Sequence, residues 1–130
     1  MEILLPEGWP RPSGYSNAIK ASGSMIFIAG LVGWDETKTF QSDGIVGQFE
    51  QILINTFALL EEAGAKPKHM VRMTWYITSK PEYLTNLKEI GLVYRKIMGK
   101  NYPTMACLEV KALIEDKAKI EIETTAVVPN

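Results

Sequence analysis

Two segments with a helical apolar period enclose one segment with a strand period, and this order restricts the folds available to the chain. Residues 45–63 are predicted to form the first helix, with apolar positions at Ile45, Phe49, Ile52, Leu53, Phe57 and Leu60. Residues 71–77 alternate between apolar and polar side chains, which indicates a half-buried strand. A second helical stripe follows at Tyr83, Leu87, Ile90, Tyr94 and Ile97. This order predicts a sheet with both helices packed on one face.

Residues with strong capping preferences mark the ends of these helices. Ser42 or Asp43 is expected to cap the start of the first helix. Ser79 and Glu82 have the spacing of a capping box at the start of the second helix, and Gly99 is expected to end it.

The remaining apolar runs predict the other strands. Residues 18–21 and 25–29 flank "SGS", which predicts a hairpin, and the run "MIFIA" is expected to be buried on both faces because it lacks alternation. Two strands near residues 104–112 and 119–128 close the chain, whereas residues 1–17 are expected to be irregular. The chain is therefore predicted to form one α+β domain over residues 1–130.

Composition and charge exclude several classes of function. A net charge of −1 without a cluster of basic residues argues against binding to nucleic acid or to an anionic membrane. The longest apolar run, residues 25–34, is too short to span a bilayer, and the proline-broken N-terminus does not resemble a signal peptide. One cysteine and one histidine predict no metal site and no cofactor, and the single cysteine predicts a cytoplasmic protein.

Period-2 parity sorts the side chains of the last two strands into two faces. Met105, Cys107 and Glu109 share one side, and Glu121 and Glu123 share a side of the last strand. We expect both sets on the sheet face that the helices leave uncovered, which would suit self-association. Two readings of the glutamates stay open at this point, namely a solvated strand face and a pair for acid–base chemistry.

Four segments then resemble one known family. They are "GYSNAI", "MIFIAGLVGWD", "QFEQILINTFALLEEAGAKPKHMVRMTWYIT", and "YPTMACLEV" followed by "KIEIETTAV". Together they resemble the RidA/YjgF family of enamine/imine deaminases, also named L-PSP endoribonucleases, over residues 12–128. The resemblance implies a chorismate-mutase-like fold, a homotrimer around a central barrel of sheets, and small-molecule clefts between subunits.

The resemblance also implies site residues. The family's water-positioning glutamate corresponds to Glu123, its N-terminal tyrosine to Tyr15, and the glycine after its second strand to Gly30. The arginine that binds the substrate carboxylate corresponds to Met105, and an asparagine of the second helix corresponds to Gly91. The other residues expected to line the cleft are Leu31, Trp34, Ala106 and Cys107.

Methionine at the arginine position changes the expected substrate. Met105 is apolar and offers no donor to a carboxylate, so simple 2-imino acids are expected to bind poorly. Arg72 or Lys111 is a candidate replacement for the missing charge. Trp34 and Phe40 either line the cleft, which would favour a larger and flatter ligand, or pack between subunits.

Two hypotheses for function follow. In the first, the protein hydrolyses an enamine or imine with Glu123 orienting or deprotonating water. In the second, the same cleft binds or senses a small metabolite without catalysis. Cys107 is interpreted as a small apolar wall residue whose thiolate is disfavoured by acidic neighbours, and RNA cleavage is disfavoured by the lack of a basic patch.

Overall fold

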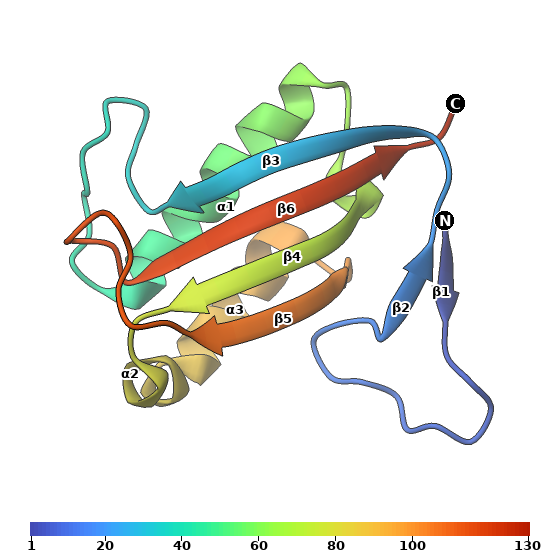
Figure 1. Cartoon of the computed structure of the whole chain (residues 1–130), viewed down its shortest axis with the longest axis horizontal. Coiled ribbons are helices and arrows are strands. Elements are labelled where there is room, and N and C mark those ends of the chain that lie inside the picture. The colour runs from blue at the N-terminus through green and yellow to red at the C-terminus, as the bar shows by residue number, and fades with distance from the viewer.

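The computed structural model describes all 130 residues and shows an α+β fold with one four-stranded sheet (Figure 1). The strands are β3 (Ser24–Val32), β6 (Ile120–Val128), β4 (Met70–Ile77) and β5 (Thr104–Glu109), in that spatial order. β6 is antiparallel to β3 and to β4, whereas β4 and β5 are parallel. The last strand of the chain is therefore central, and β3 and β5 are the two edges of the sheet.

The helices cover one face of this sheet (Figure 1). They are α1 (Ile45–Glu62), α2 (Lys80–Thr85) and α3 (Leu87–Met98), and a short 3-10 turn, η1 (Pro67–His69), leads into β4. The predicted first helix is confirmed, whereas the predicted second helix is two helices. Asn86 leaves the helical conformation between them and donates from its side chain to the Glu82 carbonyl at 2.8 Å. Leu87, expected in the buried stripe, is exposed as a result of this break, and Met98 is buried instead.

The helix ends follow the sequence only in part. Ser79 accepts a hydrogen bond from the Glu82 backbone N–H at 3.2 Å, but the Glu82 carboxylate pairs with Lys119 at 3.1 Å, so only the Ser79 half of the predicted capping box forms. Gly99 ends α3 with a positive φ of 63°, as predicted. The N-cap of α1 is Gly44, without a side-chain hydrogen bond, so the predicted cap at Ser42 or Asp43 is wrong. The Ser42 hydroxyl instead accepts a hydrogen bond from the Gly44 backbone N–H. Gly44 precedes the helix, so this bond satisfies no N–H of the helix itself.

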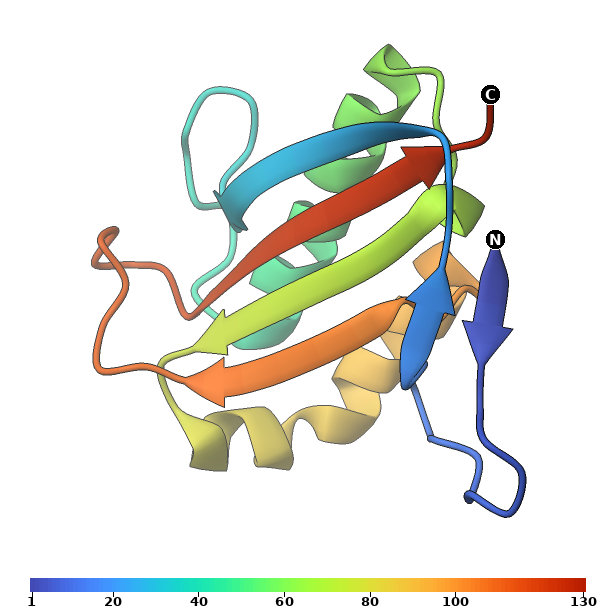
Figure 2. The same cartoon turned by 45° about the vertical axis from the view of Figure 1, so that its right-hand side comes forward.

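The N-terminal segment forms a separate strand pair. β1 (Glu2–Leu4) pairs with β2 (Ala18–Lys20), so the predicted hairpin between β2 and β3 is wrong, as is a wholly irregular N-terminus. Gly23, with φ of 144°, lies against the Val128 carbonyl so closely that any side chain would collide with it. This contact turns β3 alongside β6 and away from β2. Figure 2 shows the β1–β2 pair beside the β5 edge.

Gln48 connects α1 to the loops at one end of the sheet. Its fully buried side-chain amide donates to the carbonyls of Ser42 at 3.1 Å and Lys117 at 2.9 Å, and it accepts from the Lys119 N–H at 2.8 Å. Gly33 packs against this residue, because a Cβ at position 33 would lie 2.5 Å from the Gln48 Cβ. One side chain therefore fixes two loops that are far apart in sequence.

The face of the sheet opposite the helices is uncovered, and we call it the open face. Its side chains are Met25, Phe27, Arg72, Thr74, Tyr76, Thr104, Ala106, Leu108, Glu121, Glu123, Thr125 and Val127. Phe27 is 72% exposed and Met25 is 58% exposed, so the expectation that "MIFIA" is buried on both faces is wrong for the single chain. The predicted outward direction of Glu121 and Glu123 is confirmed, because Ile120, Ile122 and Thr124 are buried under the helices.

The predicted direction of the β5 side chains is wrong. Met73 and Trp75 of β4 are buried beneath the helices. Met105 is in register with Met73, and Cys107 is in register with Trp75, so both β5 side chains point to the helix side. Met105 packs against this core, and the Glu109 carboxylate accepts from the Lys80 N–H at 2.7 Å. Parity shows which residues share a side but not which side they face. Register with the buried Ile77 places Glu109 on the helix side, where its charge lies at the N-terminus of α2.

Candidate functional site

The predicted site residues divide between the two edges of the sheet. Gly30 and Leu31 lie on β3, and Trp34 follows that strand, whereas Tyr15, Met105 and the other β5 residues lie at the opposite edge. Glu123 lies between the edges on β6. The chain brings Tyr15, Met105 and Ala106 together, but two strands, β6 and β4, separate them from the β3 group.

A hollow of about 430 Å³ surrounds Tyr15 at the start of β5, and we call it the Tyr15 hollow. Its wall includes Tyr15, Asn17, Arg72, Thr74, Met105 and Ala106. Ser16 anchors this wall, because its N–H donates to the Pro103 carbonyl at 3.2 Å and its hydroxyl donates to the Tyr102 carbonyl at 2.5 Å. The segment before β2 is therefore attached to the segment that enters β5.

Glu123 has a hydrogen-bond donor on the neighbouring strand. The Tyr76 hydroxyl of β4 donates to Glu123 Oε1 at 2.7 Å, and Glu123 is in register with Thr74. This bond orients one oxygen of an exposed carboxylate and leaves the other free for water. Tyr76 was missed in the sequence. Its alternation with Trp75 placed it on the polar side of the strand, but its pairing with Glu123 depends on a strand register that the sequence does not contain.

The same bond gives a pH-dependent prediction for Tyr76. The hydrogen bond to Glu123, then partial burial and the charges of Glu123 and Glu121, raise the pKa of the Tyr76 phenol above its ordinary value. A raised pKa means that the neutral phenol is favoured, so replacing the carboxylate should lower it. We expect Tyr76 to ionise at lower pH in Glu123→Gln than in the wild type, followed as tyrosinate absorbance with Tyr76→Phe to assign the signal. An unchanged titration would show that this bond does not form in solution.

Gly30 and Leu31 have structural roles in the single chain. The Gly30 Cα lies against the Glu121 carboxylate so closely that a Cβ would collide with it. The β3–β6 register shifts between Ile28 and Leu31, and the Leu31 side chain packs against the core. Gly30 therefore faces a carboxylate, whereas Leu31 does not face the open side.

Trp34 belongs to an ordered loop after β3. Its ring lies 5.7 Å from the Phe40 ring and 5.7 Å below the Lys38 ammonium. Asp35 accepts hydrogen bonds from Thr37, Gln41 and Thr39, and these bonds hold the pKa of its carboxyl well below the ordinary range. The aromatic pair lines a hollow of about 400 Å³ with Ile114, which is separate from the Tyr15 hollow.

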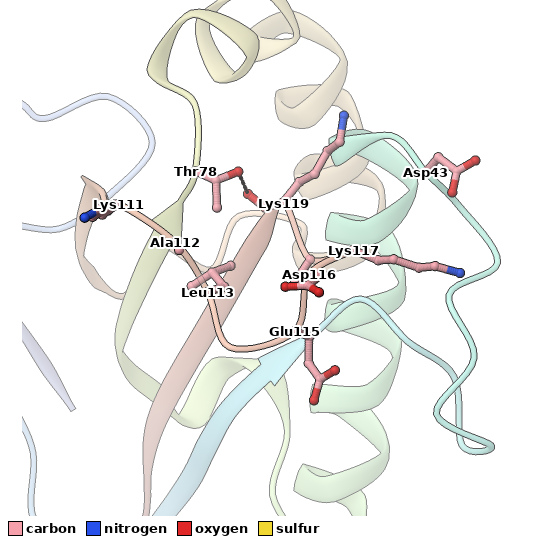
Figure 3. A pocket seen from close by; sticks show the side chains of 10 residues that line it. Asp43, Thr78, Lys111, Ala112, Leu113, Glu115, Asp116, Lys117 and Lys119 are labelled. Carbon is pink, nitrogen blue, oxygen red and sulfur yellow. Dashed lines mark hydrogen bonds between the residues drawn. The ribbon is translucent and has the colours of Figure 1, made fainter.

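A further hollow of about 450 Å³ lies at the β5–β6 connection, and Figure 3 shows its side chains. Lys111 lines it together with Thr78, Asp116 and Lys119. Lys111 follows the end of β5, whereas Met105 lies near its start, so Lys111 does not line the Tyr15 hollow. Of the two candidate replacements for the missing charge, only Arg72 lies there.

The Cys107 thiol lies on the helix side, near Tyr83 of α2. Burial raises the pKa of this thiol, and a hydrogen bond from the Tyr83 hydroxyl opposes the rise only in part. The thiolate is therefore disfavoured, as predicted, although burial is the cause and Glu123 lies on the other face.

Gly91, at the family's asparagine position, lies on α3 in the helix layer. None of the helices combines the length and apolar character needed to cross a membrane.

Comparison with known proteins agrees with this fold. The family model "Endoribonuclease L-PSP" matches residues 10–128. A RutC family protein of Pyrococcus abyssi is 35% identical over 127 residues, covering 96% of this chain and 95% of that protein. The chloroplastic Reactive Intermediate Deaminase A of Arabidopsis thaliana is 33% identical, covering 96% of this chain and 65% of that protein. A crystal structure of the Rid family protein YyfB from Yersinia pestis superposes with a TM-score of 0.84 at 30% identity, covering 98% of each chain. The chain therefore belongs to the endoribonuclease L-PSP family, which includes the RidA and YjgF proteins.

Proposed function

We propose that this protein hydrolyses an enamine or imine intermediate, with Glu123 positioning and deprotonating the attacking water. The carboxylate is exposed on the open face and oriented by Tyr76 at 2.7 Å, and this is the observation that carries the proposal. Water would add to the C=N carbon and give one proton to Glu123. Glu123 would pass that proton to nitrogen to give a carbinolamine, and would then move the proton of the carbinolamine hydroxyl to nitrogen as well, so that the C=O bond forms, the C–N bond breaks and ammonia leaves. A relative named as a deaminase of reactive intermediates supports the same chemistry.

The proposal includes a homotrimer with clefts between its subunits. The Met105 side chain and Glu123 point to opposite faces, and the β3 group lies at the other edge, so a single chain does not surround one substrate. Contact between the open face of one copy and the β5 edge of another would bring these residues together. The exposed Phe27 and Met25 supply apolar surface for such a contact. We place the protein in the cytoplasm as part of the same proposal, because its single cysteine is free.

The proposed substrate is not a simple 2-imino acid. In such a substrate the carboxylate is bonded directly to the reacting carbon, and the family position for the cation that binds it holds Met105. The Met105 thioether packs against the core and offers no hydrogen-bond donor. A carboxylate placed there would lose its hydration without gaining a partner.

Ammonia release from a panel of imines tests the proposal. Aromatic imines without a carboxylate on the reacting carbon would be generated in place from arylalkylamines by a flavin amine oxidase, and 2-iminopropionate would be generated from alanine by an amino-acid oxidase for comparison. We expect faster ammonia release with at least one aromatic imine and little acceleration with 2-iminopropionate. Light scattering would report whether the active species is a trimer. A folded trimer that accelerates no member of the panel would refute the enzymatic function.

Non-catalytic binding of a small metabolite is the alternative, and Met105 and Gly91 at two family site positions favour it. Under this alternative no cofactor is needed and Glu123 is only one wall of the cleft. Glu123→Ala separates the two functions. An enzyme should lose the ammonia release that the wild type shows, whereas a binding protein should show no release in either form and should keep most of its affinity for the ligand.

A further inference from the structure

We propose that the turn that leads into β4 is pH-sensitive, and that protonation of His69 opens it. His69 is the single histidine of the chain, and it is the last residue of η1, directly before Met70 at the start of β4. η1 lies on the connection between α1 and β4 (Figure 1). This turn belongs neither to the open face nor to the β5 edge, so it lies outside the surfaces proposed for subunit contact.

Both backbone polar groups of Lys66 bond to His69. The Lys66 N–H donates to His69 Nδ1 at 3.0 Å, and the Lys66 carbonyl accepts from the His69 N–H at 2.9 Å. The first of these bonds has the form found in a capping box, in which the side chain of the third helical residue reaches back to the backbone N–H of the N-cap. The imidazole therefore closes a turn that the backbone bond alone would leave open at the Lys66 N–H.

The bond to Nδ1 exists in one protonation state of the ring only. A ring nitrogen that accepts a hydrogen bond carries no proton, so the bonded form of His69 is the neutral imidazole with its proton on Nε2. Protonation places a hydrogen on Nδ1 and makes both ring nitrogens donors. The Lys66 N–H then faces another N–H and loses its acceptor, which opens the turn.

Two lysines of the same turn act against the protonated ring. Partial burial, then the charges of Lys68 and Lys66, lower the pKa of the His69 imidazole from its ordinary value. Residues 66–69 already carry these two positive charges, and an imidazolium adds a third. The charge that breaks the hydrogen bond is therefore also repelled by its neighbours.

The neighbouring elements supply no carboxylate that would compensate this charge. β6 packs against η1 with its C-terminal part, residues 124–128, which has no ionisable side chain. Glu61 and Glu62 end α1, but neither forms an ion pair with His69. Arg72 of β4 lies on the open face and is itself positive. Opening of the turn at low pH is therefore unopposed by an acidic partner.

The direction of the pH effect follows from the lowered pKa. The folded chain binds this proton less readily than the unfolded chain does. The stabilising contribution of the closed turn is therefore complete above the histidine pKa of the unfolded chain, and it is lost as the pH falls through the lower pKa of the folded chain. Ala65 and Met70 are buried on either side of the turn, so the opening is confined to residues 66–69.

Amide hydrogen exchange of the full chain tests the inference. The measurement runs between about pH 8 and pH 5, the range in which histidine titrates. We expect the protection factor of the Lys66 amide to fall about 2- to 10-fold over this range, which corresponds to the net contribution of one hydrogen bond. The fall should follow the titration of the His69 Cε1–H resonance, which needs no assignment because the chain has one histidine.

His69→Gln is the matched control variant. Glutamine can accept the Lys66 N–H as the third residue of a capping box does, but it does not ionise. We expect this variant to hold the Lys66 protection factor constant over the same pH range. The neighbouring Ala65 N–H, which donates to the Leu60 carbonyl at 2.8 Å, should keep its protection in both proteins.

Three results would overturn the inference. The first is a His69 titration in the folded chain at the same pH as in the urea-unfolded chain, or at a higher pH. The second is a Lys66 protection factor that stays constant while His69 becomes protonated. The third is an equal loss of protection in His69→Gln. These readouts do not use turnover, so they are independent of the proposed deaminase activity.

Discussion

Glu123→Gln is expected to slow imine hydrolysis by about 10²- to 10⁴-fold, which is the usual contribution of a positioned acid or base. Glutamine keeps the size of the side chain and can still accept the hydrogen bond that Tyr76 donates at 2.7 Å. It cannot take a proton from water at neutral pH. The loss should therefore appear in kcat, and substrate binding should be nearly unchanged.

Glu121→Gln is the matched control for this experiment. Glu121 lies on the same strand and the same face, two residues from Glu123, and it is in register with Tyr76. Its carboxylate rests against Gly30, however, so it is directed to the β3 side. We expect this variant to change kcat less than about 10-fold, which is below the range for a positioned acid or base. Equal losses in the two variants would show that the face needs negative charge and not one positioned carboxylate.

Gln48→Leu is expected to lower the free energy of unfolding by about 3 kcal/mol or more. The wild-type amide makes three hydrogen bonds from a fully buried position. Leucine fills a similar volume but leaves the carbonyls of Ser42 and Lys117 and the Lys119 N–H without this partner. Each buried polar group left unsatisfied costs about 1–3 kcal/mol, less where water can reach it. Chemical denaturation followed by far-UV circular dichroism measures the change.

Gln51→Leu is the comparison that isolates this effect. Gln51 lies one turn along the same helix, is partly exposed, and bonds only to the Asn55 side chain at 2.9 Å. A substitution at such a surface position should change stability by about 0.5 kcal/mol or less. If the two leucine variants were equally stable, the loops at residues 33–44 and 110–119 would not depend on Gln48.

The helices were predictable because their signals are local. The apolar period of residues 45–63 and the N-cap at Ser79 need only neighbouring residues, and both are observed. The break at Asn86 was missed, because an asparagine whose side chain caps the preceding turn looks like any polar residue in a helical period. Strand partners were less predictable. β2 pairs with β1 across a loop, and nothing near "SGS" shows that β3 turns away.

The site was predictable only as far as the resemblance reached. Family motifs identify Tyr15, Glu123 and the change at Met105 without any knowledge of the sheet. The side that Met105 faces, the bond between Tyr76 and Glu123, and the place of Arg72 beside Tyr15 all depend on strand register. Register joins residues about 30 to 50 positions apart here, as Met73 with Met105 and Tyr76 with Glu121 show. A period within one strand carries no information on that pairing.

The central place of β6 has a consequence for synthesis of the chain. β3 and β4 each pair with β6, and neither pairs with the other, so the sheet has no continuous form until β6 is made. While β6 is still in the ribosome, α1 and β4 can form locally, but the apolar surface of β3 has no partner. Such exposed strands are prone to aggregate. The sheet is therefore completed only when β6 is available, and loss of this nine-residue strand would remove the middle of the sheet rather than an edge.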